Sequence, residues 1–410
     1  MADDRMPLTV TADNDRHLWT LTVEGRGPGR PVMVGGTLYV PVPGERIAAL
    51  DPGRGQVRWC SEKVERASLD GMAVAGGVLV VPVRQERGRG AFTALDAATG
   101  KVLWTRRKSA LTRVVAVGDS AFVLWNENDD DGRRQGLTGI DALTGETLWE
   151  DEFERISWVV GRGDLVILDA RGIRALDARS GEEIWDRGSG SLLVGAGADE
   201  DEAVFLSYDP YGGNTLAVQA SDTGKRISET RFPDKLGMRH SWVTPELVDG
   251  GRALFFDTFE RWILLFAYAG LNQARSLGSW KLGRWRLSSL RDVVCVGDRV
   301  YALSGRRKLY VAEVGGRRGL RRLALRGPDG RIVRMPWHLT AGPGYLVAHG
   351  SYGVAVIRDG RVLWASETLR MTGDPMPLDG DRVLFVAPSK KGNTARLYCA
   401  DVDTGRRLLP

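Results

Sequence analysis

The residues that most often carry chemistry in proteins are few and scattered in this sequence. Its histidines and cysteines are His17, His240, His338, His349, Cys60, Cys295 and Cys399. A zinc site needs such ligands at short spacing on one or two elements. No pair of the histidines has that spacing, and the cysteines are odd in number and far apart. We therefore expect no metal site, and we expect free thiols in a reducing compartment.

Other catalytic patterns are equally weak. The acidic run 127–132 has the composition of a calcium loop but lacks the alternating ligands and the final glutamate. No phosphate-binding glycine loop, serine nucleophile elbow or cysteine–histidine signature is present. The sequence therefore predicts no catalytic residue and no cofactor. The acidic start, Met1–Arg5, has no signal-peptide core behind it, so we expect a cytoplasmic protein.

Charge is the more informative property of the chain. Residues 1–250 hold 30 basic and 39 acidic side chains, whereas residues 251–410 hold 27 basic and 13 acidic ones. Arginine binds carboxylates and phosphates through a bidentate fork, so a dense arginine cluster predicts an acidic protein surface or a phosphate-bearing ligand as its target. The alternative interpretation is an ordinary solvated surface. The candidate partner-binding residues are Arg317, Arg318, Arg321, Arg322 and Arg326.

A sequence motif that recurs along the chain indicates the strands and turns that must position these residues. We call this motif the phrase. A small residue, an apolar residue and Asp are followed by two variable residues, Thr or Ser, Gly, three variable residues and Trp. Asp and Thr can accept or donate hydrogen bonds within a tight turn, and Gly tolerates positive φ. A Trp at one fixed place is best explained as a wedge between sheets. The conserved places of the phrase are filled by Asp51, Gly55 and Trp59, by Asp96, Gly100 and Trp104, by Asp141, Gly145 and Trp149, and by Asp177, Gly181 and Trp185, with Trp364 ending a shortened copy.

A second marker, a tight turn before a short β run, recurs nine times at intervals of about 43 residues, the size of a four-stranded propeller blade. Eight of these turns contain glycine, and the one at residues 199–202 is acidic instead. The stretch 17–21 resembles the Trp-bearing outer strand of a blade and comes before the first one. We therefore predict an all-β fold, a single closed β-propeller of eight or nine four-stranded blades, nine by direct count. The N-terminal strand is expected to close the ring. Residues 1–15 are expected to be frayed, and residues 16–410 to form one domain.

The phrase resembles the tryptophan-docking motif of the pyrroloquinoline quinone (PQQ)-like repeat. That resemblance covers nearly the whole chain and implies a propeller similar to the quinoprotein dehydrogenases or to the non-enzymatic, BamB-like propellers of bacterial outer-membrane assembly. The dehydrogenases bind PQQ beside a disulfide of adjacent cysteines and a calcium held by Glu, Asn and Asp. This sequence has no adjacent cysteines, so the resemblance does not imply a PQQ enzyme here.

Two functions remain open at this point. The first is a non-enzymatic cytoplasmic scaffold, a monomer that binds a protein or peptide, acidic in character, through its face loops and the basic sector. The second is an enzyme or a small-ligand-binding propeller with its site at the mouth of the central channel. We expect no membrane partner, because the longest apolar run, residues 262–271, is too short to span a bilayer. We expect no nucleic acid as partner, because no recognised binding motif supports one.

Overall fold

Short extended runs, most of them separated by tight turns, give this chain thirty-seven strands and no helix in the part of it that is described. The computed structural model describes residues 8–13, 18–24, 31–42, 46–64, 72–84, 89–109, 113–118, 121–125, 135–154, 156–188, 192–196, 204–209, 215–231, 243–248, 252–257, 262–267, 275–281, 290–305, 308–316, 319–325, 338–350, 353–366, 371, 374–388 and 394–405. A search of these residues for a helix long and apolar enough to span a membrane finds none.

The strands pair antiparallel into nine sheets within the described residues, numbered here in chain order. Sheets 1 to 4 contain β3 (Val32–Val34), β4 (Thr37–Val42), β5 (Arg46–Leu50) and β6 (Val57–Cys60); β7 (Ala73–Ala75), β8 (Val78–Arg84), β9 (Arg89–Asp96) and β10 (Val102–Ser109); β11 (Arg113–Val117), β12 (Ala121–Trp125), β13 (Gln135–Asp141) and β14 (Thr147–Phe153); and β15 (Trp158–Arg162), β16 (Leu165–Asp169), β17 (Ile173–Asp177) and β18 (Glu183–Asp186).

Sheets 5 to 8 repeat the same four-stranded plan. They contain β19 (Leu192–Ala196), β20 (Val204–Asp209), β21 (Thr215–Ala220) and β22 (Arg226–Arg231); β23 (Val243–Val248), β24 (Arg252–Asp257), β25 (Trp262–Ala267) and β26 (Arg275–Lys281); β27 (Leu290–Val296), β28 (Arg299–Ser304), β29 (Leu309–Glu313) and β30 (Arg321–Leu323); and β31 (His338–Gly342), β32 (Tyr345–Gly350), β33 (Gly353–Arg358) and β34 (Arg361–Ser366).

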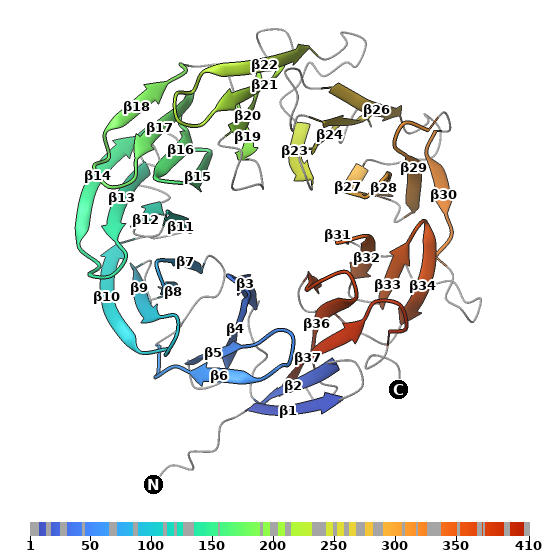
Figure 1. Ribbon diagram of the computed structural model, residues 1–410, viewed down its shortest axis with the longest axis horizontal. Coiled ribbons are helices and arrows are strands. Elements are labelled where there is room, and N and C mark those ends of the chain that lie inside the picture. Colours follow the sequence, from blue (N-terminus) through green and yellow to red (C-terminus); the bar gives the residue numbers. More distant parts are fainter. Residues whose placement is uncertain are drawn as a thin grey trace.

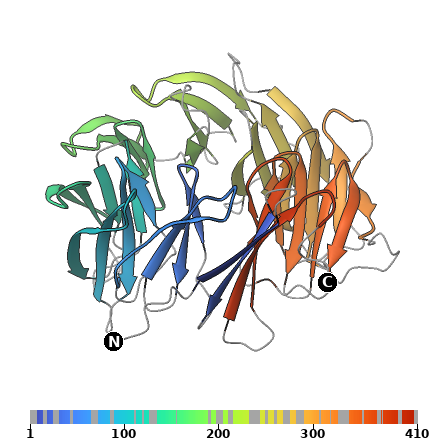
Figure 2. The same cartoon turned by 60° about the horizontal axis from the view of Figure 1, so that its bottom comes forward.

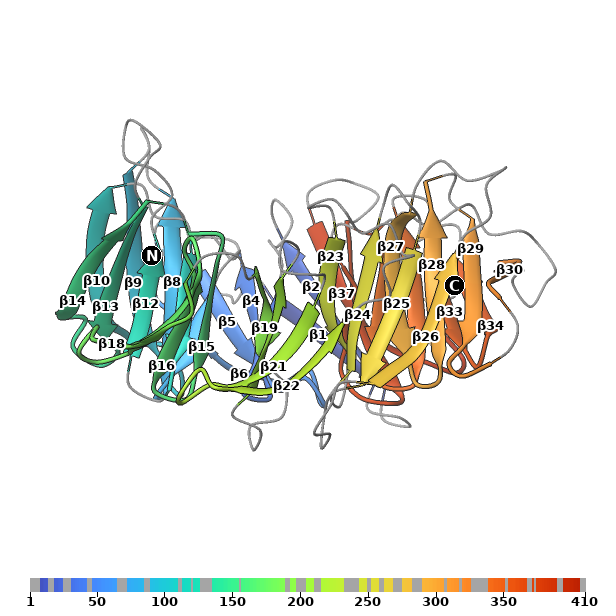
Figure 3. The same cartoon turned by 90° about the horizontal axis from the view of Figure 1, so that it is seen from above.

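The nine sheets stand around a common centre in chain order, the arrangement of a β-propeller (Figure 1). In sheets 1 to 8 the first strand is innermost and the last is outermost, so that β27 and β31 face the centre whereas β14 and β30 lie on the rim (Figure 1). Turned views show the sheets upright and side by side, with their strands running through the thickness of the ring (Figures 2 and 3). The all-β propeller predicted from the repeat is confirmed, with nine sheets rather than eight.

The middle strands are apolar at nearly every position because both of their faces are covered. In sheet 1, Leu38 and Val40 of β4 pack in a core shared with sheet 9, whereas Tyr39 between them packs in a core shared with sheet 2. Alternate residues of one strand therefore serve two different interfaces, and the strand loses the usual alternation of polar and apolar residues. The outer strands are polar because solvent covers them, as β14 shows with five of its seven residues exposed.

Sheet 9 brings the two ends of the chain together. Its own strands are β35 (Met376–Pro377), β36 (Arg382–Pro388) and β37 (Thr394–Asp401), and β2 (Leu18–Glu24) pairs antiparallel with β37, for example Thr20 with Tyr398. A fifth strand, β1 (Leu8–Asp13), pairs with the outer edge of β2. The expectation of a frayed N-terminus over residues 1–15 is therefore wrong for residues 8–13, because β2 offers them a strand edge; residues 1–7, 14 and 15 lie outside the described residues.

Candidate functional site

The tryptophan of the repeated phrase reaches across to the turn of the next sheet. Trp59 Nε1 donates to the carbonyl oxygen of Ala97 at 2.9 Å, and its ring covers Gly100, where an added Cβ would lie 2.4 Å from the ring. Gly100 has a φ of +73°, a left-handed value that favours glycine. The same indole bond joins Trp104 to Ala142, Trp149 to Ala178, Trp185 to Ser221 and Trp364 to Val402, and the rings of Trp104 and Trp149 cover Gly145 and Gly181.

The aspartate side chains of the phrase accept hydrogen bonds from groups of their own turns. Asp96 Oδ1 accepts from the amides of Ala98 and Thr99 and from the Thr99 hydroxyl, at 2.7 to 3.0 Å. Asp141 and Asp177 make the same three bonds, and Asp51 accepts the two amides but no hydroxyl, since Arg54 stands at the Thr place. These four carboxylates therefore shape the turns that receive the tryptophans, with Gly55, Gly100, Gly145 and Gly181 closing them.

The turn carboxylates give a pH-dependent contribution to stability. Hydrogen bonds from Thr99 lower the pKa of Asp96 in the folded protein, so its stabilising effect is present above the unfolded pKa of about 3.9 and is lost as the pH falls through the folded value. We expect Asp96→Ala to lower the free energy of unfolding by about 1 kcal/mol at neutral pH. The difference from wild type should shrink below about pH 3.9 in urea titrations. A constant difference at every pH would contradict the role, and the exposed Glu62→Ala is the control.

Arginines also cross between neighbouring sheets, both beside an intact phrase, as Arg106 of sheet 2 does to Gly145 of sheet 3, and where the phrase is lost or shortened. Arg299 of sheet 7 contacts Asp359 of sheet 8 at 2.7 Å, and Arg358 of sheet 8 contacts Asp403 beyond β37 at 2.6 Å. Two further arginines donate to carbonyl oxygens of the next sheet, Arg252 to Gly297 and Arg382 to Gly53. Part of the arginine excess of residues 251–410 is therefore engaged inside the ring. This role was not predicted from the sequence, although Arg252, Arg299 and Arg382 each follow a glycine turn directly.

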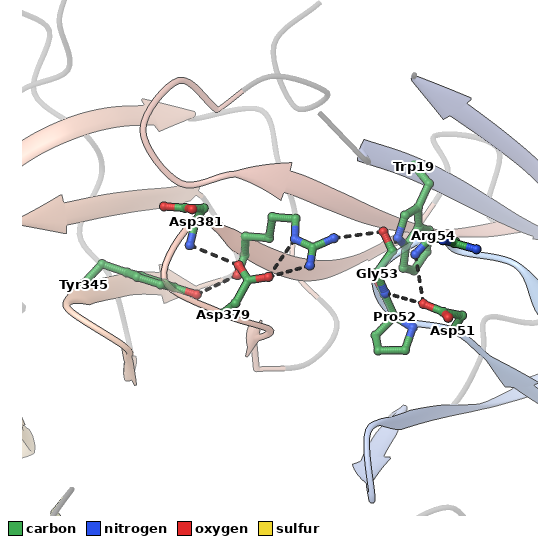
Figure 4. Close-up of polar contacts among 9 residues, drawn as sticks. Trp19, Asp51, Pro52, Gly53, Arg54, Tyr345, Asp379 and Asp381 are labelled. Atoms are coloured by element: carbon green, nitrogen blue, oxygen red, sulfur yellow. Dashed lines mark hydrogen bonds and ion pairs between the residues drawn. The ribbon is translucent and has the colours of Figure 1, made fainter. Parts of the chain in front are cut away.

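The junction between sheets 9 and 1 has both kinds of contact, a tryptophan bonded to the turn of the next sheet and an arginine that crosses between sheets (Figure 4). Trp19 Nε1 donates to the carbonyl oxygen of Pro52 at 2.9 Å, in the turn shaped by Asp51. Arg382 donates to the Gly53 carbonyl at 2.8 Å and is held by Asp379, whose carboxylate accepts from its Nε at 2.8 Å and its Nη2 at 2.5 Å. Segments 329 positions apart in sequence are thus joined by direct hydrogen bonds.

The predicted partner-binding arginines are only partly within the described residues. Arg317, Arg318 and Arg326 lie outside them. Arg321 and Arg322 are exposed on β30, the outermost strand of sheet 7. A Cβ on Gly360 of sheet 8 would lie 3.4 Å from Arg321 Nη2, so this guanidinium lies over the neighbouring turn. Arg322 occupies the next register position, opposite Tyr310, and successive strand residues point to opposite faces. The structure therefore separates two arginines that the sequence treated alike.

A polar cluster that the sequence did not predict lies at the centre of the ring. His338 and His349 are direct register partners on β31 and β32, and their rings stack at a centroid distance of 5.7 Å. The His349 side chain is almost completely buried, and its Nε2 lies 3.0 Å from Thr340 Oγ1 and 3.9 Å from a carboxylate oxygen of Asp374. Strands β31 and β27 are the innermost strands of sheets 8 and 7 (Figure 1). The cluster therefore lines the inner edge of the propeller.

Asp292 of β27 completes this cluster. Its Oδ2 accepts from the backbone amide of Leu339 at 2.8 Å, which links sheet 7 to sheet 8. Burial raises the pKa of the Asp292 carboxyl above its ordinary value, and His338 and Asp374 are close enough to act on it electrostatically. The exposed His338 imidazole and the neighbouring carboxyl groups can exchange hydrogen bonds with a small polar molecule. The eleven-residue spacing of the histidines gave no helical or zinc-like signal; only the β31–β32 register brings them together.

The described residues do not fit the quinone and calcium of the PQQ dehydrogenases. Cys60, Cys295 and Cys399 lie on three different strands, and all are free thiols. Among the residues with described side chains, no three of histidine, cysteine, aspartate or glutamate converge in a way that could hold a metal ion. The turn aspartates are occupied by backbone amides. We therefore assign none of the described residues to a quinone or a calcium ion.

Comparison with known proteins matches the N-terminal part of the chain to one family model. The family model described as "Outer membrane protein assembly factor BamB" matches residues 5–157 and 43–188 in two overlapping alignments. BamB from Moraxella catarrhalis is 13% identical with a TM-score of 0.39, over 72% of this chain and 85% of that one. The quinohemoprotein alcohol dehydrogenase ADHIIG from Pseudomonas putida HK5 is 14% identical with a TM-score of 0.48, over 95% of this chain and 76% of that one. A comparison with curated proteins finds no match.

Proposed function

From the premise that the chain is a β-propeller of PQQ-like repeats, we propose that it is a non-enzymatic scaffold that binds an acidic protein or peptide in the cytoplasm. Support comes from the matching family model, which describes an assembly factor, and from the three free thiols, which suit a reducing compartment. The proposed site is the rim of sheet 7 around β30. This strand is both basic and outermost.

The observation that carries this proposal is the state of Arg322. It is exposed on the rim and forms no ion pair with the described residues, in contrast to Arg299, Arg358 and Arg382, which are engaged between sheets. The guanidinium of an arginine that has no ion pair within the protein can bind a carboxylate of another molecule through two parallel hydrogen bonds. Arg317, Arg318 and Arg326, which flank β30 in the sequence, are proposed to belong to the same surface.

A polyglutamate peptide serves as a test ligand for this surface. We expect Arg317, Arg318, Arg321 and Arg322 changed together to serine to weaken its binding at least about ten-fold, because each exposed ion pair contributes up to about 1 kcal/mol. Wild-type binding should weaken with added salt, since the Debye length falls to about 8 Å at physiological ionic strength. Fluorescence anisotropy at two salt concentrations measures both effects.

Two single variants separate binding from folding in this test. Arg322→Ser should weaken binding without changing the melting temperature, whereas Arg321→Ser should also affect stability because its guanidinium lies over Gly360. The exposed Arg361→Ser on β34 is the matched control for loss of one positive charge. If Arg361→Ser weakens binding as much as Arg322→Ser, the peptide is responding to net charge and the β30 site is rejected.

The central cluster favours a second function, the binding of a small polar molecule at the inner edge of the ring. His338 is exposed and stacks on the buried His349, so a ligand could reach the outer imidazole while the inner one is held in place. Asp292, with its raised pKa, offers a carboxyl that keeps its proton more readily than an exposed one. A polyol or an amine would match these groups, because together they donate and accept hydrogen bonds.

Thermal denaturation with a panel of polyols and amines tests this second function. We expect at least one compound to raise the melting temperature of wild type, since a ligand that binds the folded state stabilises it. At one hundred times the dissociation constant the gain is about 2.7 kcal/mol. The same compound should have no effect on His338→Gln. A compound that stabilises both proteins equally binds elsewhere, and a panel without any effect leaves the scaffold function alone.

A further inference from the structure

The outermost strand of sheet 3 has a free edge. Strand β14 pairs with β13 on one side, and no described strand pairs with its other side. A strand edge is a row of backbone N–H and C=O groups that can accept another strand. Five of its seven residues are exposed, and only Trp149 and Phe153 are buried. The edge is therefore seven residues long and carries no further described strand, although the Glu152 amide is held by the Asp151 carboxylate at 2.7 Å.

The same position is already occupied in one sheet of this molecule. In sheet 9 the Trp-bearing outer strand is β2, and β1 pairs antiparallel with its outer edge from Leu8 opposite Val23 to Asp13 opposite Leu18. Strand β2 presents Trp19 to the next sheet as β14 presents Trp149. An outer strand of this propeller therefore keeps its contact with the next sheet while it carries an additional strand.

The charge of β14 defines which strand it would accept. Glu150, Asp151 and Glu152 are consecutive and exposed, Glu146 precedes the strand, and β14 contains no basic residue. Glu154, which follows the strand, is ion-paired with Arg171. An added strand would lie about 4.8 Å away, within reach of carboxylates on both faces. Acidic strands, including β14 of another copy, are repelled, and a segment rich in lysine or arginine is attracted. Leu148, which is 40% exposed, offers an apolar contact beside these charges.

The other rim strands with four-stranded sheets differ from β14. Strand β18 has only four residues. Each of the remaining outer strands, β6, β10, β22, β26, β30 and β34, contains at least one arginine or lysine. A long free edge with acidic residues alone is thus a property of β14 among these strands. We propose that β14 is a strand-addition site for a basic, extended segment of a partner protein, separate from the acidic partner of β30.

A twelve-residue peptide of alternating lysine and valine serves as the probe. We expect wild type to bind it and hydrogen exchange to slow at alternate amides of β14, because the amides that face the free edge become hydrogen-bonded. A second peptide of the same sequence, with N-methyl groups on alternate residues, keeps the charge but cannot complete the ladder. It should bind at least about ten-fold more weakly if each lost backbone bond contributes about 1 kcal/mol.

Variants of the protein test the charge. Glu150→Gln, Asp151→Asn and Glu152→Gln combined should weaken binding at least about ten-fold. The melting temperature of this variant, measured alongside, separates a loss of binding from a loss of stability. Glu62→Gln, Asp222→Asn and Glu313→Gln combined, which removes three exposed carboxylates elsewhere, should bind like wild type. Equal binding of the N-methylated peptide, equal loss in the control variant, or slowed exchange away from β14 would each overturn the proposal. Failure of the β30 test would not affect it.

Discussion

Replacing Trp19 with alanine should lower the free energy of unfolding by about 3–5 kcal/mol, the usual cost of truncating a buried aromatic side chain. Trp19 is completely buried, and its indole N–H is hydrogen-bonded to the Pro52 carbonyl. It packs with Leu38 of sheet 1 and Leu384 of sheet 9. The substitution leaves a cavity and an unpaired carbonyl where the N-terminal strand, the last sheet and the first sheet meet.

Urea denaturation followed by circular dichroism measures this loss without depending on tryptophan fluorescence. The matched control is Trp158→Ala, because the Trp158 side chain is 47% exposed on the innermost strand β15, and exposed substitutions usually change stability by less than about 0.5 kcal/mol. An unchanged midpoint for Trp19→Ala would show that the contact between β2 and sheet 1 contributes nothing to the fold.

Gly55→Ala should destabilise the same junction by about 2–4 kcal/mol, from two additive causes. Gly55 has a φ of +67°, a conformation that costs an L-residue about 1–2 kcal/mol. An added Cβ would also lie 2.4 Å from Cγ of Trp19, so the buried indole would have to move. The measurement is again the urea midpoint, with Gly36→Ala as the control, since Gly36 has a φ of +69° but nothing within 4 Å.

The double variant separates the two causes. In Trp19→Ala the indole is absent. Adding Gly55→Ala to this variant should therefore lower the free energy of unfolding only by the cost of a positive φ at an alanine, about 1–2 kcal/mol. Strict additivity of the two single variants would mean that Gly55 and Trp19 do not interact, and would refute the steric argument.

The sequence by itself determined the architecture, because its information is local and repeated. Asp-x-x-Thr-Gly forms one turn from its own five residues, as the bonds of Asp96 to Ala98 and Thr99 show. A Trp four positions after the Gly is placed on the outer strand by strand geometry alone. Nine units at a regular spacing then predict a ring of sheets, since each unit can cover its apolar faces only with its neighbours. Even the pairing of the N-terminal strand with the last sheet follows, because a free edge must be covered.

The tertiary structure alone decided which side chains meet across the sheets. His338 meets His349 because β31 and β32 pair in one register, and a shift by one residue would separate the rings. Arg382 reaches Gly53 only because the first and last sheets become neighbours in the ring. Arg321 lies over Gly360 while Arg322 occupies the opposite face of a three-residue strand. Turns and repeats are set by residues a few positions apart, whereas sites arise from packing between units, whose energies depend on geometry that no single repeat contains.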